Sequence, residues 1–261
     1  MKFNPYSVSK LGTYNQCPLK FKLNYIEKIR VPFTYNVALY KGSYIHEILE
    51  HNYDYDTPFK TNEIFTEQEK EKSKSIVKTF ENSDLGIKYK KIALSDEFKS
   101  VHEEKFGYKI VNSKLEICDY WDKECWIRGA IDFQYIDGDK VYNIDWKSGK
   151  SHATEKDFGI TQSTAYSIFL FLKYPEIDTV VSNFVFVEHS NEKEIIYTRD
   201  KFNEYVKYFY DMTKTVEIDE IYKEDVGALC DWCDFYKHGY CNKPKEKAEI
   251  TDTFMNSKIT F

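Results

Sequence analysis

The chain has 261 residues, a formal net charge of −6 at pH 7, and 42% hydrophobic and 17% aromatic residues. This length fits one large domain or one domain with a small appendage, and the apolar content is ample for a core and argues against disorder. The negative charge excludes a protein that attracts nucleic acid over its whole surface, so any phosphate-binding face must be local. Two basic runs are candidates for it, although each alone is more typical of a solvated helix face. They are Lys10, Lys20, Lys22, Lys28 and Arg30, and Lys88, Lys90 and Lys91.

The sequence contains no apolar run of the ~18–20 residues that a bilayer span needs. Its first residues, Met-Lys-Phe-Asn-Pro, lack the apolar segment of a signal peptide. We therefore expect a cytoplasmic protein, and the frequent Lys, Asn, Ile, Tyr and Phe indicate a prokaryotic or phage gene from an AT-rich genome. In a reducing compartment the six cysteines are expected to be thiols or metal ligands rather than disulfides.

The first part of the chain predicts short helices. Ser7 and Ser9 precede a short helix from Lys10 to Tyr14, and Cys17-Pro18 interrupts it, because the residue before proline avoids the helical region. A loop or extended piece is expected from Val31 to Leu39. Aromatic side chains interleaved with lysines here could stack single-stranded bases, but at this aromatic content they are more often core. These aromatics are Tyr6, Tyr14, Phe21 and Tyr25.

A second helix is expected from about Gly42 to His51. His46 and Glu50 are four residues apart and so share one side of it. A lone histidine on such a helix usually packs or caps, so this pair alone does not establish a site. The polar pattern from Thr61 to Asn82 predicts a further helix, within a helical insertion over residues 52–100 that covers the site.

A strand from Val101 to Val111 carries Glu103 and Glu104, which alternation places on opposite faces. Either can supply a carboxylate to a site, and the sequence does not choose between them. A strand containing Glu116 and Ile117 is expected next.

The stretch from Trp126 to Lys150 predicts a β-hairpin, because two β-branched and aromatic runs flank Asp137-Gly138-Asp139. Each run contains one aspartate in an apolar context: Asp132, and Asp145 two residues before Lys147. Carboxylates in half-buried strands are costly unless a cation or donor meets them. Two of them beside a lysine indicate a hard-cation site with a positioned ammonium. The alternative is ordinary ion pairing with Arg128 and Lys147.

The remaining elements complete a mixed α/β sheet flanked by helices. Gln162 and Tyr166 share one face of the helix that follows the hairpin. The expected elements are a helix from about Thr154 to Leu172, strands from Thr179 to Val187 and from Glu194 to Thr198, and a helix from Phe202 to Met212.

Four short motifs occur in a fixed order on these elements. They are Gly42-x-x-x-His46-x-x-x-Glu50, Gly129-x-x-Asp132, Asp145-x-Lys147 and Gln162-x-x-x-Tyr166. Each alone is weak, but together they resemble the RecB-type branch of the PD-(D/E)XK nuclease superfamily, from about Ser7 to Cys241. The resemblance implies a restriction-endonuclease-like core with a central mixed β-sheet, in a single nuclease domain over residues 1–261.

The resemblance also implies a role for each matching residue. His46, Asp132, Asp145 and the backbone carbonyl of Trp146 would bind Mg²⁺ or Mn²⁺, with both aspartates catalytic. Lys147 would contact the attacking water or the scissile phosphate. Two further roles follow: Gln162 and Tyr166 would position the DNA strand, and Glu50 would orient His46.

The implied activity is that of a metal-dependent DNA exonuclease acting on single strands or free ends, in recombination, repair or phage DNA processing. One alternative is a trimming nuclease of the CRISPR-adaptation type. Either a recombination enzyme or a CRISPR-adaptation nuclease would have a protein partner. Another is a catalytically silent DNA-binding module. Co-purifying partners would identify a CRISPR-adaptation nuclease. DNA binding without metal-dependent cleavage would identify a silent DNA-binding module.

Four cysteines form a second constellation. Cys17 precedes Pro18, and Cys230, Cys233 and Cys241 follow a C-x-x-C pattern with a further cysteine after seven intervening residues, a spacing typical of metal ligands. It resembles the iron–sulfur nucleases of the AddB-like and CRISPR-associated adaptation types, and implies a 4Fe–4S cluster. Residues 1–30 and 225–245 would then form a cluster-binding subdomain.

A structural Zn²⁺ site on the same four cysteines is the alternative, because thiolates suit both. His238 lies in the last gap and is an alternative ligand. Cys118 and Cys125 fall outside the pattern and are expected to be ordinary thiols.

Overall fold

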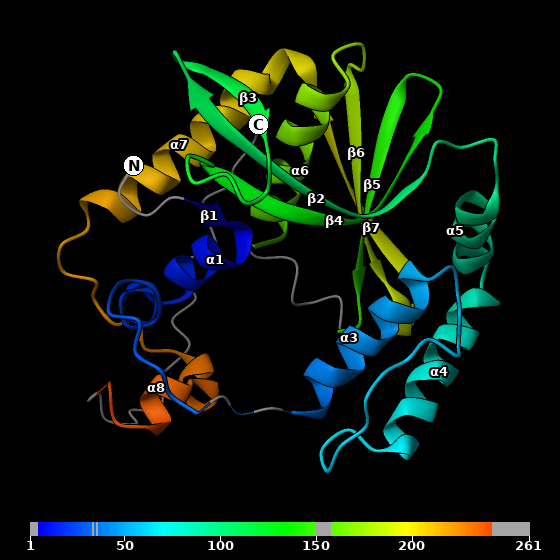
Figure 1. Ribbon diagram of the computed structural model, residues 1–261, viewed down its shortest axis with the longest axis horizontal. Helices are drawn as coiled ribbons and strands as arrows, with labels where there is room; N and C mark the ends of the chain where they lie inside the picture. The colour runs from blue at the N-terminus through cyan, green and yellow to red at the C-terminus, as the bar shows by residue number, and fades with distance from the viewer. Residues whose placement is uncertain (1–4, 33, 35, 150–157, 242–261) are drawn as a thin grey trace.

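The computed structural model describes residues 5–32, 34, 36–149 and 158–241. Within these residues seven strands form one mixed sheet in the order β3-β2-β4-β5-β6-β7, and β1 pairs with β4 off this path (Figure 1). The strands are β1 (Tyr6–Ser7), β2 (Val101–Val111), β3 (Lys114–Cys118), β4 (Ile127–Asp137), β5 (Lys140–Lys147), β6 (Thr179–Phe186) and β7 (Asn191–Thr198).

The predicted hairpin is confirmed and forms the centre of the sheet. β4 and β5 pair antiparallel from Phe133↔Ile144 to Asp137↔Lys140. Gly138 in the turn has a φ of 61°, which glycine adopts without steric cost. β5 then pairs in parallel with β6, so helix α6 (Phe158–Lys173) makes the crossover between them.

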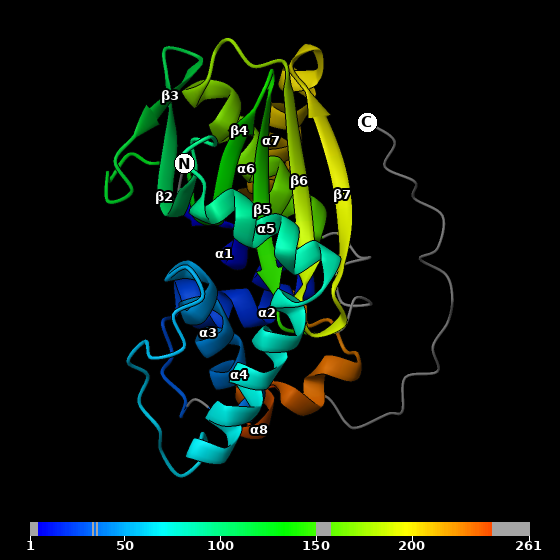
Figure 2. The ribbon, with the colours of Figure 1, turned by 90° about the vertical axis from the view of Figure 1, so that its right-hand side faces the viewer.

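Helices cover both faces of the sheet. One core cluster joins the sheet to α1, α2, α6 and α7, and a second joins it to α3, α4 and α5. Figure 2 shows α5 in front of the central strands and α6 and α7 behind them. The helices are α1 (Val8–Gln16), α2 (Pro18–Phe21), α3 (Val37–Glu50), α4 (Glu67–Glu81), α5 (Asp84–Leu94), α6, α7 (Phe202–Ile218) and α8 (Asp234–Lys237). A π-helix, Lys22–Ile26, and three short 3₁₀ segments, Val187–His189, Arg199–Lys201 and Ala228–Trp232, complete the described elements.

The first helices form as the sequence predicts. Ser7 caps α1 by accepting the backbone N–H of Lys10 at 3.1 Å. Cys17 is extended, with a φ of −167°, and separates α1 from α2, whose first residue is Pro18. Tyr6 and Phe21 are fully buried, so they belong to the core and do not stack bases.

Two helical segments differ from the prediction. The segment from Val31 to Leu39 is not all loop, because Asn36 caps α3 by accepting the Leu39 N–H at 3.1 Å and starts the helix at Val37. The basic run at Lys88–Lys91 belongs to α5, a helix within the insertion predicted over residues 52–100 whose own bounds were not predicted. There Lys88 and Lys90 pair with Glu192 and Glu81, so these two charges are neutralised within the fold.

None of the helices in the described residues is both long and apolar enough to cross a membrane.

Candidate active site

Asp132 lies where β4 and β5 separate. Their pairing ends at Phe133↔Ile144, so Asp132 and Asp145 lie just beyond the last pair. The Asp132 carboxylate accepts the backbone N–H of Trp146 at 2.9 Å and so replaces a strand partner. Ile131 packs in the cluster under α6 and Phe133 in the cluster under α3, so the alternation of β4 is interrupted at Asp132. The fork between the two strands therefore presents the carboxylate of Asp132, whose side chain is partly buried, to a neighbouring helix.

That helix is α3, which brings His46 to the fork. His46 Nδ1 lies 3.5 Å from Asp132 Oδ2, and the side chains are 33% and 14% exposed. The close approach depends on Gly42, because a Cβ there would lie 3.0 Å from Ser148 Oγ, just beyond β5. The glycine of the first motif thus allows α3 to pack closely against the end of β5.

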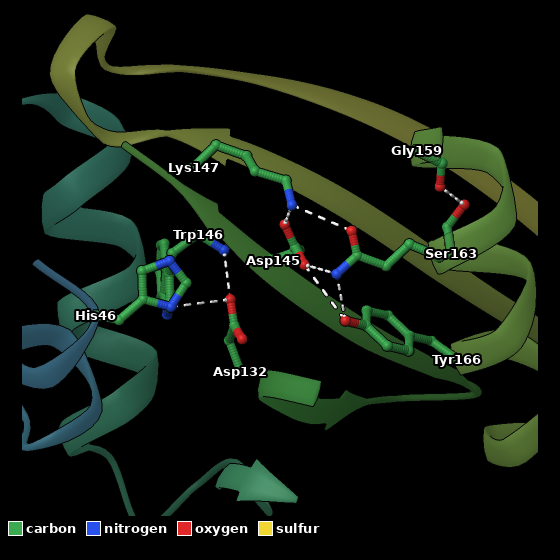
Figure 3. A network of polar contacts seen from close by, with 9 residues as sticks. His46, Asp132, Asp145, Trp146, Lys147, Gly159, Ser163 and Tyr166 are labelled. Carbon is green, nitrogen blue, oxygen red and sulfur yellow. Dashed lines mark hydrogen bonds and ion pairs between the residues drawn. The ribbon is translucent and has the colours of Figure 1, made fainter. Parts of the chain in front are cut away.

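Asp145 points to the other side of the fork, toward α6 (Figure 3). Lys147 forms an ion pair with Asp145 Oδ2 and donates to Gln162 Oε1 at 3.1 Å. The Gln162 amide donates to Asp145 Oδ1 and to the Tyr166 hydroxyl, and that hydroxyl donates to Asp145 Oδ1 at 3.4 Å. Gln162 and Tyr166 therefore hold Asp145 and Lys147 in place.

Burial and mutual repulsion dominate the electrostatics of the fork. Burial raises the pKa of Asp132 well above its ordinary range, and the nearby Asp145 raises it further, against the opposing N–H of Trp146 and the charge of Lys147. Burial lowers the pKa of His46, although the charge of Asp145 and the backbone of Trp146 act in the opposite direction. Two carboxylates so close together require more positive charge than one lysine supplies.

As placed in the described residues, His46 and the two aspartates do not form one ligand set, so their convergence on a single ion stays a prediction. Within the described ranges, no three His, Cys, Asp or Glu side chains are arranged to hold a metal ion together. The reason is that Asp145 turns to Lys147 and α6, while His46 contacts Asp132. The donors still fit a hard cation, because Asp145 Oδ2 is buried beside Lys147 without a hydrogen bond of regular geometry.

The family comparison agrees with this fold and these motifs. A model of the PD-(D/E)XK nuclease superfamily matches residues 5–240. The chain belongs to the PD-(D/E)XK nuclease superfamily. Its mixed sheet with flanking helices is the α/β fold expected of such nucleases.

One solved structure has a similar fold. A protein from Eubacterium rectale, described as "Putative exonuclease", is 14% identical with a TM-score of 0.55, and the match covers 98% of this chain and 95% of that one. SSO0001 is also 14% identical over 84% of this chain and 92% of its own, but its TM-score of 0.33 carries no weight for the fold. No curated protein matches the sequence.

The nuclease contains a further carboxylate at the fork, which sequence alternation could not assign. The pairs Glu104↔Ile131 and His102↔Phe133 place Glu103 opposite Asp132. Glu103 has a φ of 47°, an unusual conformation for a residue other than glycine within a strand. Burial and the charge of Glu50 raise its pKa, whereas His46 lowers it. Glu103 therefore faces the site.

Glu104 belongs to the opposite face of the sheet. Its carboxylate accepts hydrogen bonds from Lys173 of α6 at 2.6 Å and from Gln134. Glu50, expected to orient His46, makes no hydrogen bond to it in the described part of the chain and lies close enough to Glu103 to raise its pKa. Asp132 is the carboxylate that contacts the imidazole.

The four predicted cysteine ligands of the nuclease line one cavity of about 590 Å³, between the α1–α2 junction and the segment around α8. Cys17 Sγ accepts the N–H of Asp225 at 3.5 Å, and Cys230 Sγ accepts the N–H of Gly227 at 3.4 Å. As placed, the thiols share the cavity without forming a set of metal ligands in the described residues. Such N–H groups commonly surround ligating sulfurs, so the lining fits a sulfur-ligated group.

Cys118 and Cys125 lie elsewhere, at the two ends of the connection from β3 to β4. Both are free thiols, and burial raises the pKa of Cys125 to about 12. A thiol of this kind is unreactive near neutral pH.

Proposed function

We propose that this nuclease is a divalent-metal-dependent DNA exonuclease, which hydrolyses phosphodiester bonds at DNA ends in recombination, repair or phage DNA processing. The observation that supports it is the fork between β4 and β5, where Asp132 and Asp145 lie beside Lys147. The name of the Eubacterium rectale relative, which concerns that protein, points in the same direction.

Asp132, Asp145 and the backbone carbonyl of Trp146 would hold Mg²⁺ or Mn²⁺, with His46 on the α3 side and Glu103 opposite Asp132. When bound, the cation would supply the positive charge that the buried Asp145, the partly buried Asp132 and a phosphodiester need, and it would promote ionisation of the attacking water. An imidazole donor tilts the preference toward Mn²⁺ over Mg²⁺.

The protein's own side chains position the phosphate and the carboxylate. Lys147 presents an ammonium that can meet a phosphate oxygen, and Gln162 fixes it by accepting its hydrogen bond at 3.1 Å. Gln162 and Tyr166 also fix Asp145, whose side chain is only 4% exposed. The site is thus preorganised from three elements, α3, the hairpin and α6.

The test compares two pairs of variants on the same hairpin. Asp145→Ala and Lys147→Ala alter the fork, whereas Asp139→Ala and Lys140→Ala alter the exposed turn at its far end. With end-labelled DNA and Mn²⁺ or Mg²⁺, the first pair should lose at least about 100-fold in rate and the second pair should not. Unchanged hydrolysis in Asp145→Ala would refute the site.

A circular single strand distinguishes the two modes of cleavage. An exonuclease degrades linear strands and leaves a closed circle intact, because the circle has no end. Cleavage of the circle at the rate of the linear strand would make the enzyme an endonuclease.

We further propose that Cys17, Cys230, Cys233 and Cys241 hold a 4Fe–4S cluster with a structural role, as in the iron–sulfur subset of RecB-type nucleases. The support is that sequence positions more than 200 residues apart line one cavity. Iron and sulfide analysis of anaerobically purified protein distinguishes the cluster from Zn²⁺. Zinc without sulfide would favour the alternative.

A further inference from the structure

An exposed aromatic pair lies on the connection from β3 to β4. Trp121 is 71% exposed, unusually so for a tryptophan. Its ring meets that of Tyr120 edge to face, with centroids 4.8 Å apart. The Arg128 guanidinium lies over both rings, 4.8 Å from Tyr120 and 5.5 Å from Trp121, and donates to the Tyr120 carbonyl at 3.3 Å. The aromatic surface is therefore held in place beside a fixed positive charge.

Positive charge gathers around Arg128. Arg128 and Lys28 both lie close enough to Lys10 that their charges, after burial, help to lower the pKa of Lys10 to about 8. Two of the three acidic residues of the same connection, Asp122 and Glu124, pair with Lys109 at 2.9 and 3.6 Å, and the third, Asp119, accepts the backbone N–H of Trp121 at 2.7 Å. Within the described residues, Arg128 has no carboxylate partner in an ion pair. Like charges gathered in this way are stabilised by an anion.

The strand β4 connects this group to the fork. Ile127 and Ile131 point into the core under α6, so Arg128 and Ala130 lie on the opposite face, from which His46 approaches Asp132. Lys105 pairs with Ala130 on β2 and is exposed. Arg128 and Asp132 are four residues apart, about 13 Å along a strand. A few nucleotides of a single strand can span that distance.

We propose that Tyr120, Trp121 and Arg128 bind the single strand of DNA whose phosphodiester lies at the fork, with a base stacked on Trp121 and phosphates along Arg128 and Lys105. The assignment rests on the proposed nuclease function, which it extends by naming the substrate path. Bases of any sequence stack on an aromatic face, and phosphates meet the cations, so this path does not select sequence. A duplex keeps its bases in its own stack, which favours a single strand here.

The test measures binding of a fluorescent oligothymidylate by anisotropy in EDTA, where hydrolysis is absent. Trp121→Ala should weaken binding about five- to tenfold, and Trp121→Phe should retain most of it, because both aromatic rings stack. Arg128→Gln should reduce the salt dependence of binding by about one ion. Tyr210→Ala is the matched control, since Tyr210 is 49% exposed on α7, on the other side of the sheet, and its loss should change nothing.

The failures of the two proposals are distinguishable. A dinucleotide reaches only the fork, so its hydrolysis reports the chemistry, and oligothymidylate binding reports the path. Equal binding by Trp121→Ala, Tyr210→Ala and the unaltered protein would overturn the path even if the dinucleotide is hydrolysed. The proposed path is supported if Trp121→Ala binds oligothymidylate more weakly while its circular dichroism is unchanged and Trp121→Phe still binds. This holds even if the dinucleotide is not hydrolysed.

Discussion

The Asp132 carboxylate has a structural and an electrostatic role, and different substitutions can separate the two roles. It accepts the Trp146 N–H where the strands part, and its charge faces His46 and the nearby Asp145. The first role is structural and needs only an oxygen, whereas the second needs a charge.

Asp132→Asn should therefore keep the fold and lose activity. The amide oxygen can accept the Trp146 N–H, and removal of a charge beside Asp145 should leave the metal-free protein at least as stable as the unaltered one. Asp132→Ala leaves that N–H without its acceptor and should unfold more easily than Asp132→Asn by about 1–3 kcal/mol. Urea unfolding and the hydrolysis rate measure both effects. Equal stability of the two variants would show that the hydrogen bond is not needed.

Gln162 should act through its neighbours. Gln162→Met removes its bonds to Lys147, Asp145 and Tyr166 at similar volume. We expect kcat to fall about 10- to 100-fold with little change in KM. A raised KM with kcat intact would instead indicate direct contact with DNA, the role that the sequence motif implies.

At the scale of elements, the second motif glycine allows two strands to share one aromatic core. A Cβ at Gly129 would lie 2.8 Å from Phe106 Cζ, and that ring is buried and stacks on Phe169 with centroids 4.8 Å apart. The glycine on the strand before Asp132 is therefore a packing requirement of the β2–β4 pair.

Gly129→Ala should destabilise the protein by about 1–3 kcal/mol, because the Phe106 ring has little room to move. Gly149→Ala is the control, since a Cβ there meets nothing within 4 Å. Thermal unfolding measures both. In a Phe106→Ala background the cost of Gly129→Ala should largely vanish, and a cost that persists there would mean that the clash is not its cause.

Helix α5 is fastened to the sheet through Glu192 of β7. Asn183 donates to its carboxylate at 2.8 Å, and Tyr89 and Lys88 of α5 donate as well. Burial opposes ionisation, but these three donors outweigh it and hold the pKa of Glu192 below 4.5. A carboxyl with a depressed pKa in the folded state stabilises the protein above its unfolded pKa and loses that effect as the pH falls through the folded value.

Glu192→Gln should therefore cost about 1 kcal/mol at neutral pH, a modest amount because the site is partly exposed to solvent. The difference from the unaltered protein should shrink as the pH falls below 4.5. Urea unfolding across this range measures it, and the exposed Glu194→Gln on the same strand serves as the control. A difference that stays constant with pH would rule out ionisation as its source.

Sequence motifs located the hairpin, the helix that follows it and the residues of the fork, because turn chemistry and alternation are local properties. They could not choose Glu103 over Glu104, since that choice depends on the point at which the side-chain alternation of β2 and β4 is interrupted, opposite Asp132. They placed α5 only within a helical insertion over residues 52–100 and gave it no bounds, and its Lys88 and Lys90 are explained only by distant partners. The position of Asp145 against α6 likewise depends on packing between elements far apart in sequence.

For the whole molecule, the cysteine cavity joins the beginning and the end of the described chain. If a cluster occupies it, oxidative removal of that cluster should lower the free energy of unfolding by about 3 kcal/mol and Tm by about 6–12 °C, because a loop of more than 200 residues is released. Cys17→Ser should show the same lowered Tm before treatment, and Cys118→Ser should not. Calorimetry measures these values, and a Tm unaffected by Cys17→Ser would leave the cavity without a stabilising group.

The cavity also constrains how the protein is made. Cys17 and Cys241 are separated by 224 residues, so at about 5–20 residues per second a ribosome needs about 10–45 s between them. The hairpin, including Lys147, emerges well before that interval ends. A newly made chain thus contains both strands of the β4–β5 fork before Cys230, Cys233 and Cys241 are made. If the four cysteines hold a 4Fe–4S cluster, Cys17 is an unligated thiol during that interval, and oxygen exposure during translation should lower the yield of folded protein more than exposure afterwards.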